Sequence, residues 1–201
     1  MQTEKMHHRQ TIRLKGYDYS KAGLYFITIC THNRACLFGE ISDEKMVMNE
    51  IGKIANQCWL QIPEHFPNVI LHDHIIMPNH VHGIIELKKV VDVGAENFLP
   101  LRNNMNNIAG VENFQPPPST PRQQNEFQKM IPRSIGSIVK GFKIGVTKWV
   151  RNHTDRIDVW QRNYHDHIIR NQQSYETIAD YIISNPAKWK EDKFFINHDT
   201  A

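Results

Sequence analysis

Two strand-like runs separated by only two residues constrain this chain more than any other feature. Residues 69–77, VILHDHIIM, and residues 80–87, HVHGIIEL, are rich in β-branched and other apolar side chains. Only Pro78 and Asn79 lie between them, and tight turns favour both residue types. The spacing therefore predicts an antiparallel β-hairpin in the middle of the fold.

Hydrophobic periodicity predicts three helices and two more strands around this hairpin. Apolar side chains at steps of three and four residues indicate helices, and short β-branched or aromatic runs indicate strands. Asn49 is the expected N-cap of the first helix, Pro63 ends its pattern, and Pro186 closes the last helix. In chain order we expect a strand at 24–31, a helix at 48–62, the hairpin, a helix at 134–152, a strand at 159–169 and a helix from Ser174.

The order of these elements predicts an α+β fold. Strand, helix, strand, strand, helix and strand make the ferredoxin-like βαββαβ arrangement, a two-layer sandwich with a four-stranded antiparallel sheet. Two helices would cover one face of the sheet. The opposite face is then open to a ligand and to the additional C-terminal helix.

Length and composition indicate one domain with an insertion. The 201 residues suit a single domain of ordinary size. Between residues 88 and 132, Asn, Gln and Pro supply 17 of 45 residues, and the apolar residues follow no period. Such a segment buries too little surface to offset its ordering entropy, so we expect a largely disordered insertion.

The sequence also excludes several classes of protein. No run of about 18 apolar residues could span a bilayer, and the basic N-terminus lacks the apolar stretch of a secretory signal. Cys30, Cys36 and Cys58 are too few for a disulfide framework. We therefore expect a cytoplasmic protein without a membrane partner and with reduced cysteines.

Three pairs of histidines at alternate positions are candidates for a metal site. Because strand side chains alternate between faces, His80 and His82 point to the same face of the sheet and could share an ion. An isolated pair of this kind is more often a pair of half-buried strand histidines. Spacing alone does not choose among this pair, His72 with His74, and His165 with His167.

The last helix contains a tyrosine and an amide on one face. Tyr181 and Asn185 are four residues apart, so a phenol and an amide carbonyl project side by side. Considered alone, Tyr181 is an ordinary packed aromatic and Asn185 a helix C-terminal residue. Tyr175, on the same helix, faces well away from Tyr181, whereas Tyr164 beside His165 stays a competitor for any nucleophilic role.

Basic residues are concentrated where acidic ones are missing. No Asp or Glu occurs from Arg133 to His153, and the N-terminal arm adds Arg9, Arg13 and Lys15. An ordinary solvated helix face accounts for most such runs. We expect instead a track for a phosphate backbone, which would position DNA without reading its sequence. Its residues would be Arg133, Lys140, Lys143, Lys148, Arg151, Arg162 and Arg170.

Three motifs in order resemble the REP-associated tyrosine transposases, a branch of the single-tyrosine HUH transposases. They are MPNHVHGII, WQRNYHDHIIRN and DYIISNPAKW, and the opening RLKGYDYSKAGLYFITICTHNRACLFGEI is similar to longer members. By matching motif, the resemblance implies that His80 and His82 hold a divalent metal and that Tyr181 is the nucleophile. It also implies a third metal ligand one helical turn after the tyrosine, which is Asn185, a shorter side chain than the glutamine of related transposases.

The resemblance implies an enzyme that cleaves and rejoins single-stranded DNA at hairpin-forming repeats through a 5′-phosphotyrosyl intermediate. An open site with an amide oxygen suits Mg²⁺ or Mn²⁺, and Zn²⁺ is the alternative. Two other functions stay open, a nucleic-acid-binding module without catalysis and a metal-dependent phosphodiester hydrolase. Whether the protein acts as a monomer or a homodimer is not decided by the sequence.

Overall fold

A four-stranded antiparallel sheet in the order β4-β5-β1-β6 forms the centre of the computed structural model, which describes residues 16–89 and 131–195. The predicted hairpin is present, with its two strands joined at Pro78 and Asn79. β1 pairs with both β5 and β6. The strands are β1 (Gly23–Cys30), β4 (Val69–Met77), β5 (His80–Leu87) and β6 (His165–Ile169).

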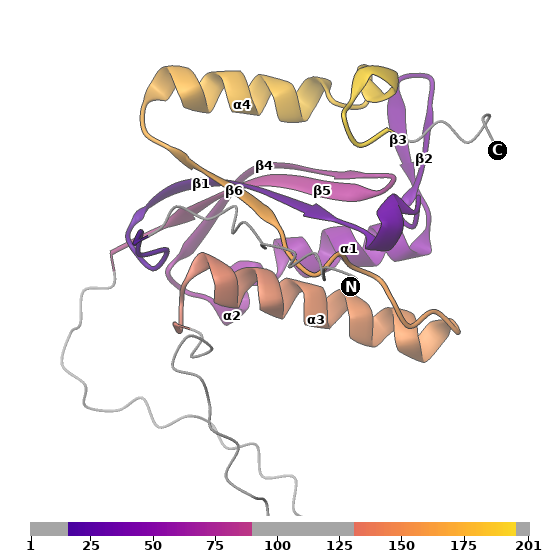
Figure 1. Ribbon diagram of the computed structural model, residues 1–201, viewed down its shortest axis with the longest axis horizontal. Coiled ribbons are helices and arrows are strands. Elements are labelled where there is room, and N and C mark those ends of the chain that lie inside the picture. Colours follow the sequence, from indigo (N-terminus) through magenta and orange to yellow (C-terminus); the bar gives the residue numbers. More distant parts are fainter. Residues whose placement is uncertain (1–15, 90–130, 196–201) are drawn as a thin grey trace, which may run out of the picture. The chain divides into compact units, whose positions relative to one another are not determined.

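Helices cover the two faces of this sheet unequally (Figure 1). α1 (Glu50–Leu60) and α3 (Ile135–His153) pack on one face, and α4 (Gln172–Ser184) lies across the other. The side chain of Asn49 accepts a hydrogen bond from the backbone N–H of Gly52, as an N-cap does. The ferredoxin-like α+β fold is therefore confirmed, including the C-terminal helix on the second face.

The apolar core lies between the sheet and the α1–α3 layer. Tyr25, Ile27 and Ile29 alternate along β1 toward this layer and are fully buried. Phe142 and Val146 of α3 pack against the same cluster. Burial of this contiguous apolar surface is the main favourable contribution to folding.

Several short elements were not expected from the sequence. β2 (Gly39–Ser42) and β3 (Lys45–Met48) form a separate two-stranded sheet. The short helix α2 (Ile62–His65) follows α1, so Pro63 lies in its first turn and does not end the helical path. A 3-10 turn, η1 (His32–Arg34), follows β1, and another, η3 (Trp189–Glu191), follows α4.

The last strand is shorter than expected. Of the predicted strand 159–169, only His165–Ile169 belongs to β6, and Trp160 makes a single bridge to Thr31. The ammonium group of Lys143 binds the carbonyl oxygens of Gln161 (2.7 Å) and Asn163 (3.0 Å). These carbonyls are thereby occupied by a side chain, whereas in a strand they would bond a neighbouring strand.

Some sequence predictions concern residues outside the described ranges. The N-terminal residues Arg9, Arg13 and Lys15 belong to these, as does nearly all of the predicted insertion 88–132. Within the described residues, no helix combines the length and the apolar character needed to cross a membrane.

Candidate active site

His80 and His82 face α4, on the side of the sheet away from the core. β5 pairs in regular register with β1, placing His82 opposite Thr28 and His80 opposite Cys30. Both imidazoles are buried, at 0% and 1% exposure, and their ring centres are 4.3 Å apart. The structure therefore brings these two predicted ligands together on one face.

Hydrogen bonds at Nδ1 orient both rings. His80 Nδ1 lies 2.8 Å from Asn79 Oδ1, and His82 Nδ1 lies 2.8 Å from Thr28 Oγ1. Because an amide oxygen only accepts, His80 carries its proton on Nδ1 and leaves the Nε2 lone pair available. Within the described part of the chain, His80 Nε2 is buried without a hydrogen-bond partner, which fits a role as a metal ligand.

Burial also keeps the two histidines neutral. It lowers the pKa of His80 to about 4, although the carboxylate of Asp192 opposes the shift. It lowers the pKa of His82 well below its ordinary value, and the neighbouring His80 adds to the effect. Neutral imidazole is the form that binds metals, so at neutral pH both rings are in the protonation state that can bind an ion.

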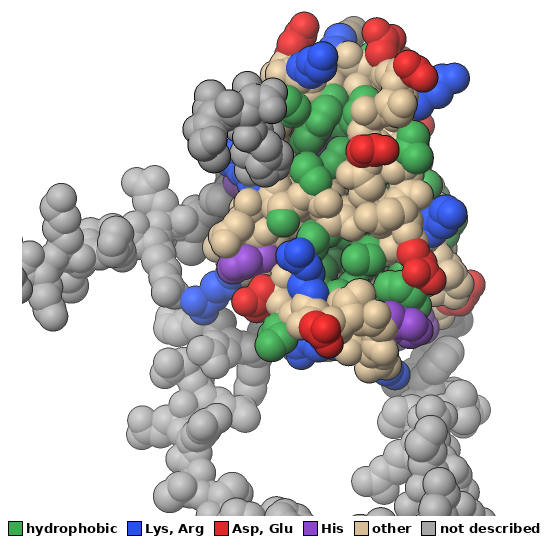
Figure 2. All heavy atoms as spheres, turned by 90° about the vertical axis from the view of Figure 1, so that its right-hand side faces the viewer, with side chains coloured by type: hydrophobic (Ala, Val, Ile, Leu, Met, Phe, Trp, Pro, Cys, Tyr) green, Lys and Arg blue, Asp and Glu red, His purple; other side chains and the backbone are tan. Residues whose placement is uncertain are grey.

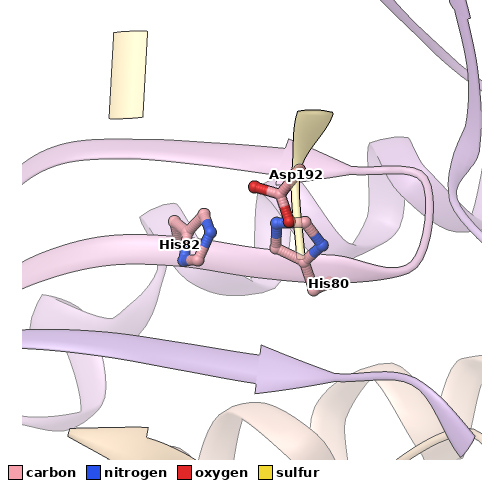
Figure 3. Close-up of side chains that lie close together, drawn as sticks. All are labelled: His80, His82 and Asp192. Carbon is pink, nitrogen blue, oxygen red and sulfur yellow. The ribbon is translucent and has the colours of Figure 1, made fainter. Parts of the chain in front are cut away.

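Asp192 adds a third donor to the pair (Figure 3). It follows η3, and its carboxylate projects over the imidazoles, so that donor atoms of Asp192, His80 and His82 all lie within 4.8 Å of one another. Two imidazoles and one carboxylate fit a divalent cation that keeps further positions open. The sequence analysis did not predict Asp192 as a ligand.

Tyr181 points from α4 into this cluster. Its hydroxyl oxygen is 3.2 Å from His82 Nε2 and donates to Asp192 Oδ2 at 2.9 Å. Burial and the hydrogen bond to Asp192 raise the pKa of Tyr181 above its ordinary value, so the phenol is protonated in this arrangement. The same carboxylate oxygen is placed to receive that proton.

Asn185 lies beside the cluster and contacts it through Asp192. Its Nδ2 donates to Asp192 Oδ2 at 2.8 Å, and the residue is 1% exposed. Its Oδ1 is buried without a hydrogen-bond partner among the described residues. The role of Asn185 as third metal ligand stays a prediction.

The competing histidine pairs are placed differently. A register shift between Leu71 and His74 interrupts β4, so His72 contacts Glu86 (2.9 Å) and His74 contacts Asn56 of α1 (2.8 Å). These two rings therefore lie on opposite faces and cannot share an ion. His165 and His167 are exposed on the edge strand β6, on the same face as His82.

The competing tyrosines lie away from the paired imidazoles. The hydroxyl of Tyr175 contacts Asp73 Oδ2 at 3.2 Å and His72 Nδ1 at 3.3 Å. Tyr164 is 9% exposed and belongs to the core cluster on the α1–α3 side. Of these three tyrosines, Tyr181 is the one beside His82.

The predicted basic track lies mostly on the other side of the sheet. α3, which carries four of its residues, covers the face opposite the paired histidines (Figure 1). Lys143 is half-buried and bound to backbone carbonyls, and burial lowers its pKa to about 8. The other six residues of the predicted track are exposed. Arg151 also donates a hydrogen bond to the carbonyl oxygen of Ile157 at 3.3 Å. The DNA-binding role of all seven residues stays a prediction. Arg133 precedes α3, Lys140, Lys148 and Arg151 belong to it, and Arg162 and Arg170 flank β6.

Two cations that the sequence analysis did not select lie close to the cluster. Arg34 and Lys193 pack over the ring of Phe194, at 5.5 Å and 4.9 Å from its centre. That ring contacts the ring of His80, with 4.7 Å between centres. Both cations help to lower the pKa of His80, which shows that their charge reaches the site. No sequence period distinguishes them from other surface cations.

The fold of this chain is similar to that of a solved tyrosine transposase structure. No protein-family model matches the chain. A solved structure of a REP-associated tyrosine transposase bound to a REP hairpin superposes with a TM-score of 0.54 and 17% identity, over 90% of this chain and 76% of that one. The fold is therefore that of the REP-associated tyrosine transposases, and the resemblance drawn from the motifs is confirmed.

Sequence comparison identifies the family. A Haemophilus influenzae protein described as uncharacterized is 42% identical over 192 residues, which is 96% of each chain. This chain belongs to the same family as that protein. A second Haemophilus influenzae protein, named "Putative REP-associated tyrosine transposase", is 22% identical over 171 residues, 85% of this chain and 74% of its own length.

Proposed function

We propose that this protein cleaves and rejoins single-stranded DNA at hairpin-type repeats, with Tyr181 as the nucleophile. The observation that carries this proposal is the position of the Tyr181 hydroxyl, within hydrogen-bond reach of His82 Nε2 and Asp192 Oδ2. A hairpin substrate is supported by the similar solved structure, whose DNA partner is a REP hairpin. The activity would make the protein a DNA strand transferase.

Tyr181 supplies the nucleophile in this reaction, and Asp192 serves both as proton acceptor and as a metal ligand. The phenol oxygen of Tyr181 attacks the scissile phosphorus, and Asp192 accepts its proton, because the two oxygens are already 2.9 Å apart. A new bond from phosphorus to the tyrosine oxygen replaces the bond from phosphorus to the 3′ oxygen. The leaving 3′ oxygen takes a proton from Asp192 or from water, so the products are a 5′-phosphotyrosyl end on one fragment and a 3′ hydroxyl on the other. Reversal by a 3′ hydroxyl of another strand restores a phosphodiester, so no ATP is consumed.

His80, His82 and Asp192 would hold the divalent ion, which we propose to be Mg²⁺ or Mn²⁺. The unpartnered Nε2 of His80 and the neutral state of both imidazoles fit this role. When bound, the ion supplies positive charge that polarises the scissile phosphate. Asn185 supports the carboxylate through its hydrogen bond to Asp192, and it competes with Asp192 for the position of third ligand.

A covalent adduct tests the proposal. The protein is incubated with Mn²⁺ and a labelled oligonucleotide that contains a repeat hairpin with single-stranded flanks, and denaturing electrophoresis then separates protein-bound label. We expect an adduct that Tyr181→Phe abolishes. Tyr175→Phe is the matched control, since that phenol on the same helix contacts Asp73 and His72 instead, and it should leave the adduct in place.

The other outcomes identify the alternative functions. Cleavage that persists in Tyr181→Phe would favour a hydrolase that uses water as the nucleophile. Binding without cleavage would favour a module that only recognises nucleic acid. The third ligand is tested by titrating Mn²⁺ into Asp192→Ala and Asn185→Ala, because the larger loss of affinity identifies the residue that contacts the ion.

A further inference from the structure

A groove on the α4 side of the sheet has no role in the chemistry described above. Phe26 of β1 and His167 of β6 line it from the sheet, and Thr177 and Ile178 line it from α4. Its volume is ≈ 610 Å³, within the range of about 300–1,000 Å³ that small-molecule sites occupy. The groove is therefore large enough for a flat organic group.

One end of the groove meets the proposed nucleophile. The ring of Phe26 is perpendicular to the ring of Tyr181, with 6.2 Å between centres, and its centre is 5.2 Å from that of His82. Phe26 thus contacts the cluster on one side and lines the groove on the other. A group bound in the groove would lie next to the phosphate that Tyr181 attacks.

The groove offers surfaces that suit an unpaired nucleobase. Phe26 and His167 are direct cross-strand partners, so both side chains project from the same face of the sheet. Hydroxyl and amide groups of Asn171, Ser174 and Thr177 also line the groove, and no residue that lines it is acidic. Bases stack on such rings regardless of sequence, and polar groups can bond their edges.

A cation lies where the nucleic-acid backbone would leave the groove. A second pocket of ≈ 330 Å³ shares His167, Asn171 and Ser174 with the groove and adds Arg170 and Asp166, of which Arg170 is exposed and Asp166 partly buried. Stacking rings followed by a positive charge are the pattern of single-strand binding surfaces. Arg170 was already expected from the sequence to contact phosphate.

The other hollow near the cluster has the opposite charge. It lies between the β2–β3 hairpin and the segment after α4, and its volume is ≈ 640 Å³. Figure 2 shows the end of the molecule that carries these elements, with both acidic and basic side chains around apolar ones in its upper part. Glu40, Asp43, Glu44 and Glu191 line this hollow together with Lys188 and Lys190, so its lining has a net negative charge and suits a phosphate backbone less well. The groove beside Phe26 is the better site for DNA.

We propose that the groove between β6 and the first half of α4 binds an unpaired nucleobase next to the cleaved phosphate, with Phe26 and His167 as the stacking surface. This inference rests on the proposed function for its substrate class. It assigns a role to His167, which the sequence analysis treated only as a competing metal ligand.

The test compares DNA that has bases with DNA that lacks them. Fluorescence anisotropy measures binding of a short labelled thymidine homopolymer and of an abasic chain with the same length and charge. We expect His167→Ala to weaken binding of the thymidine chain about fivefold to tenfold and to leave the abasic chain unchanged. His167→Tyr keeps a ring and should retain the binding. His65→Ala, an exposed histidine of α2, is the matched control and should change neither.

The outcome is independent of the cleavage assay. Tyr181→Phe should bind the thymidine chain as the unaltered protein does, because the binding assay does not depend on cleavage. A missing adduct would therefore contradict the proposed function but not the proposed binding of a base in the groove. Equal binding of the thymidine chain by His167→Ala and the unaltered protein would contradict the proposal that the groove binds a base. An equal loss on both chains would also overturn it, since His167 would then contact the backbone and not a base.

Discussion

The two strands of one hairpin each carry a histidine pair with the same spacing, and only one pair faces a common point. β5 pairs regularly with β1, so His80 and His82 project together toward α4. β4 has a register shift, and His72 and His74 therefore project to opposite faces of the sheet. The difference shows that spacing places two ligands on one face only where the strand is regular.

The largest expected effect is a difference in metal affinity between variants of the two histidine pairs. His82→Ala should weaken Mn²⁺ binding more than about 100-fold, because loss of supporting contacts alone typically costs about 10–100-fold. His74→Ala should leave the affinity unchanged, since its Nε2 bonds to Asn56. Calorimetric titration of both variants, with circular dichroism to verify folding, measures this. Equal losses would show that the two pairs do not differ as described.

Lowering the pH should destabilise the metal-free protein, because His80 is buried in its neutral form. Its pKa is about 4 in the folded state and 6.5 in the reference state, so the unfolded chain binds more protons between these values. Stability is then fully present above pH 6.5 and is lost as the pH falls toward 4, by about 3 kcal/mol from this residue. Urea unfolding in a chelator measures the slope. His80→Gln should reduce the slope and leave the part that comes from His82, and an unchanged slope would contradict the assignment.

Gly83 is expected to maintain the regular path of β5. A Cβ added there would overlap the buried indole of Trp59, which also stacks on His74 at 5.9 Å between ring centres. Gly83→Ala should therefore destabilise the protein by about 2 kcal/mol, as overpacking typically does. Urea unfolding checks the loss. Combining it with Trp59→Phe should cost less than the sum of the two single changes, and strict additivity would argue against this contact.

The smallest expected effect concerns the hydrogen bond that orients His82. Thr28→Val removes the hydroxyl 2.8 Å from His82 Nδ1 and should lower Mn²⁺ affinity about tenfold. Thr28→Ser keeps the hydroxyl and should restore the affinity. If both variants bind Mn²⁺ equally, the hydroxyl has no part in orienting the ring.

Periodicity predicted most of the fold because its elements are long and amphipathic. The hairpin, β1, α1 and α3 bury continuous apolar faces, which the sequence displays directly. β2 and β3 are four residues each and have no such face, so they were missed. Residues 159–164 are strand-like in composition, but whether they pair depends on Lys143, which belongs to another element.

The candidate site was predictable only in part. The meeting of His80, His82 and Tyr181 was expected from the resemblance of three motifs, and the structure places the three side chains together. Asp192 could not be selected, because it is one of several charged residues after Pro186 and its position depends on how the chain turns after α4. The placement of His72 and His74 on opposite faces of the sheet was equally unpredictable from the sequence, because the bulge in β4 has no distinct sequence signal.

The unequal covering of the sheet has a consequence for how such chains diverge. Substitutions between the strands and the α1–α3 layer would act on folding alone, whereas those toward α4 would act both on the smaller apolar clusters there and on the proposed chemistry. Descendants of one ancestor can therefore exchange residues on the second side while they inherit the first side nearly intact. Low overall identity between two members is compatible with a common architecture and with different nucleic-acid targets.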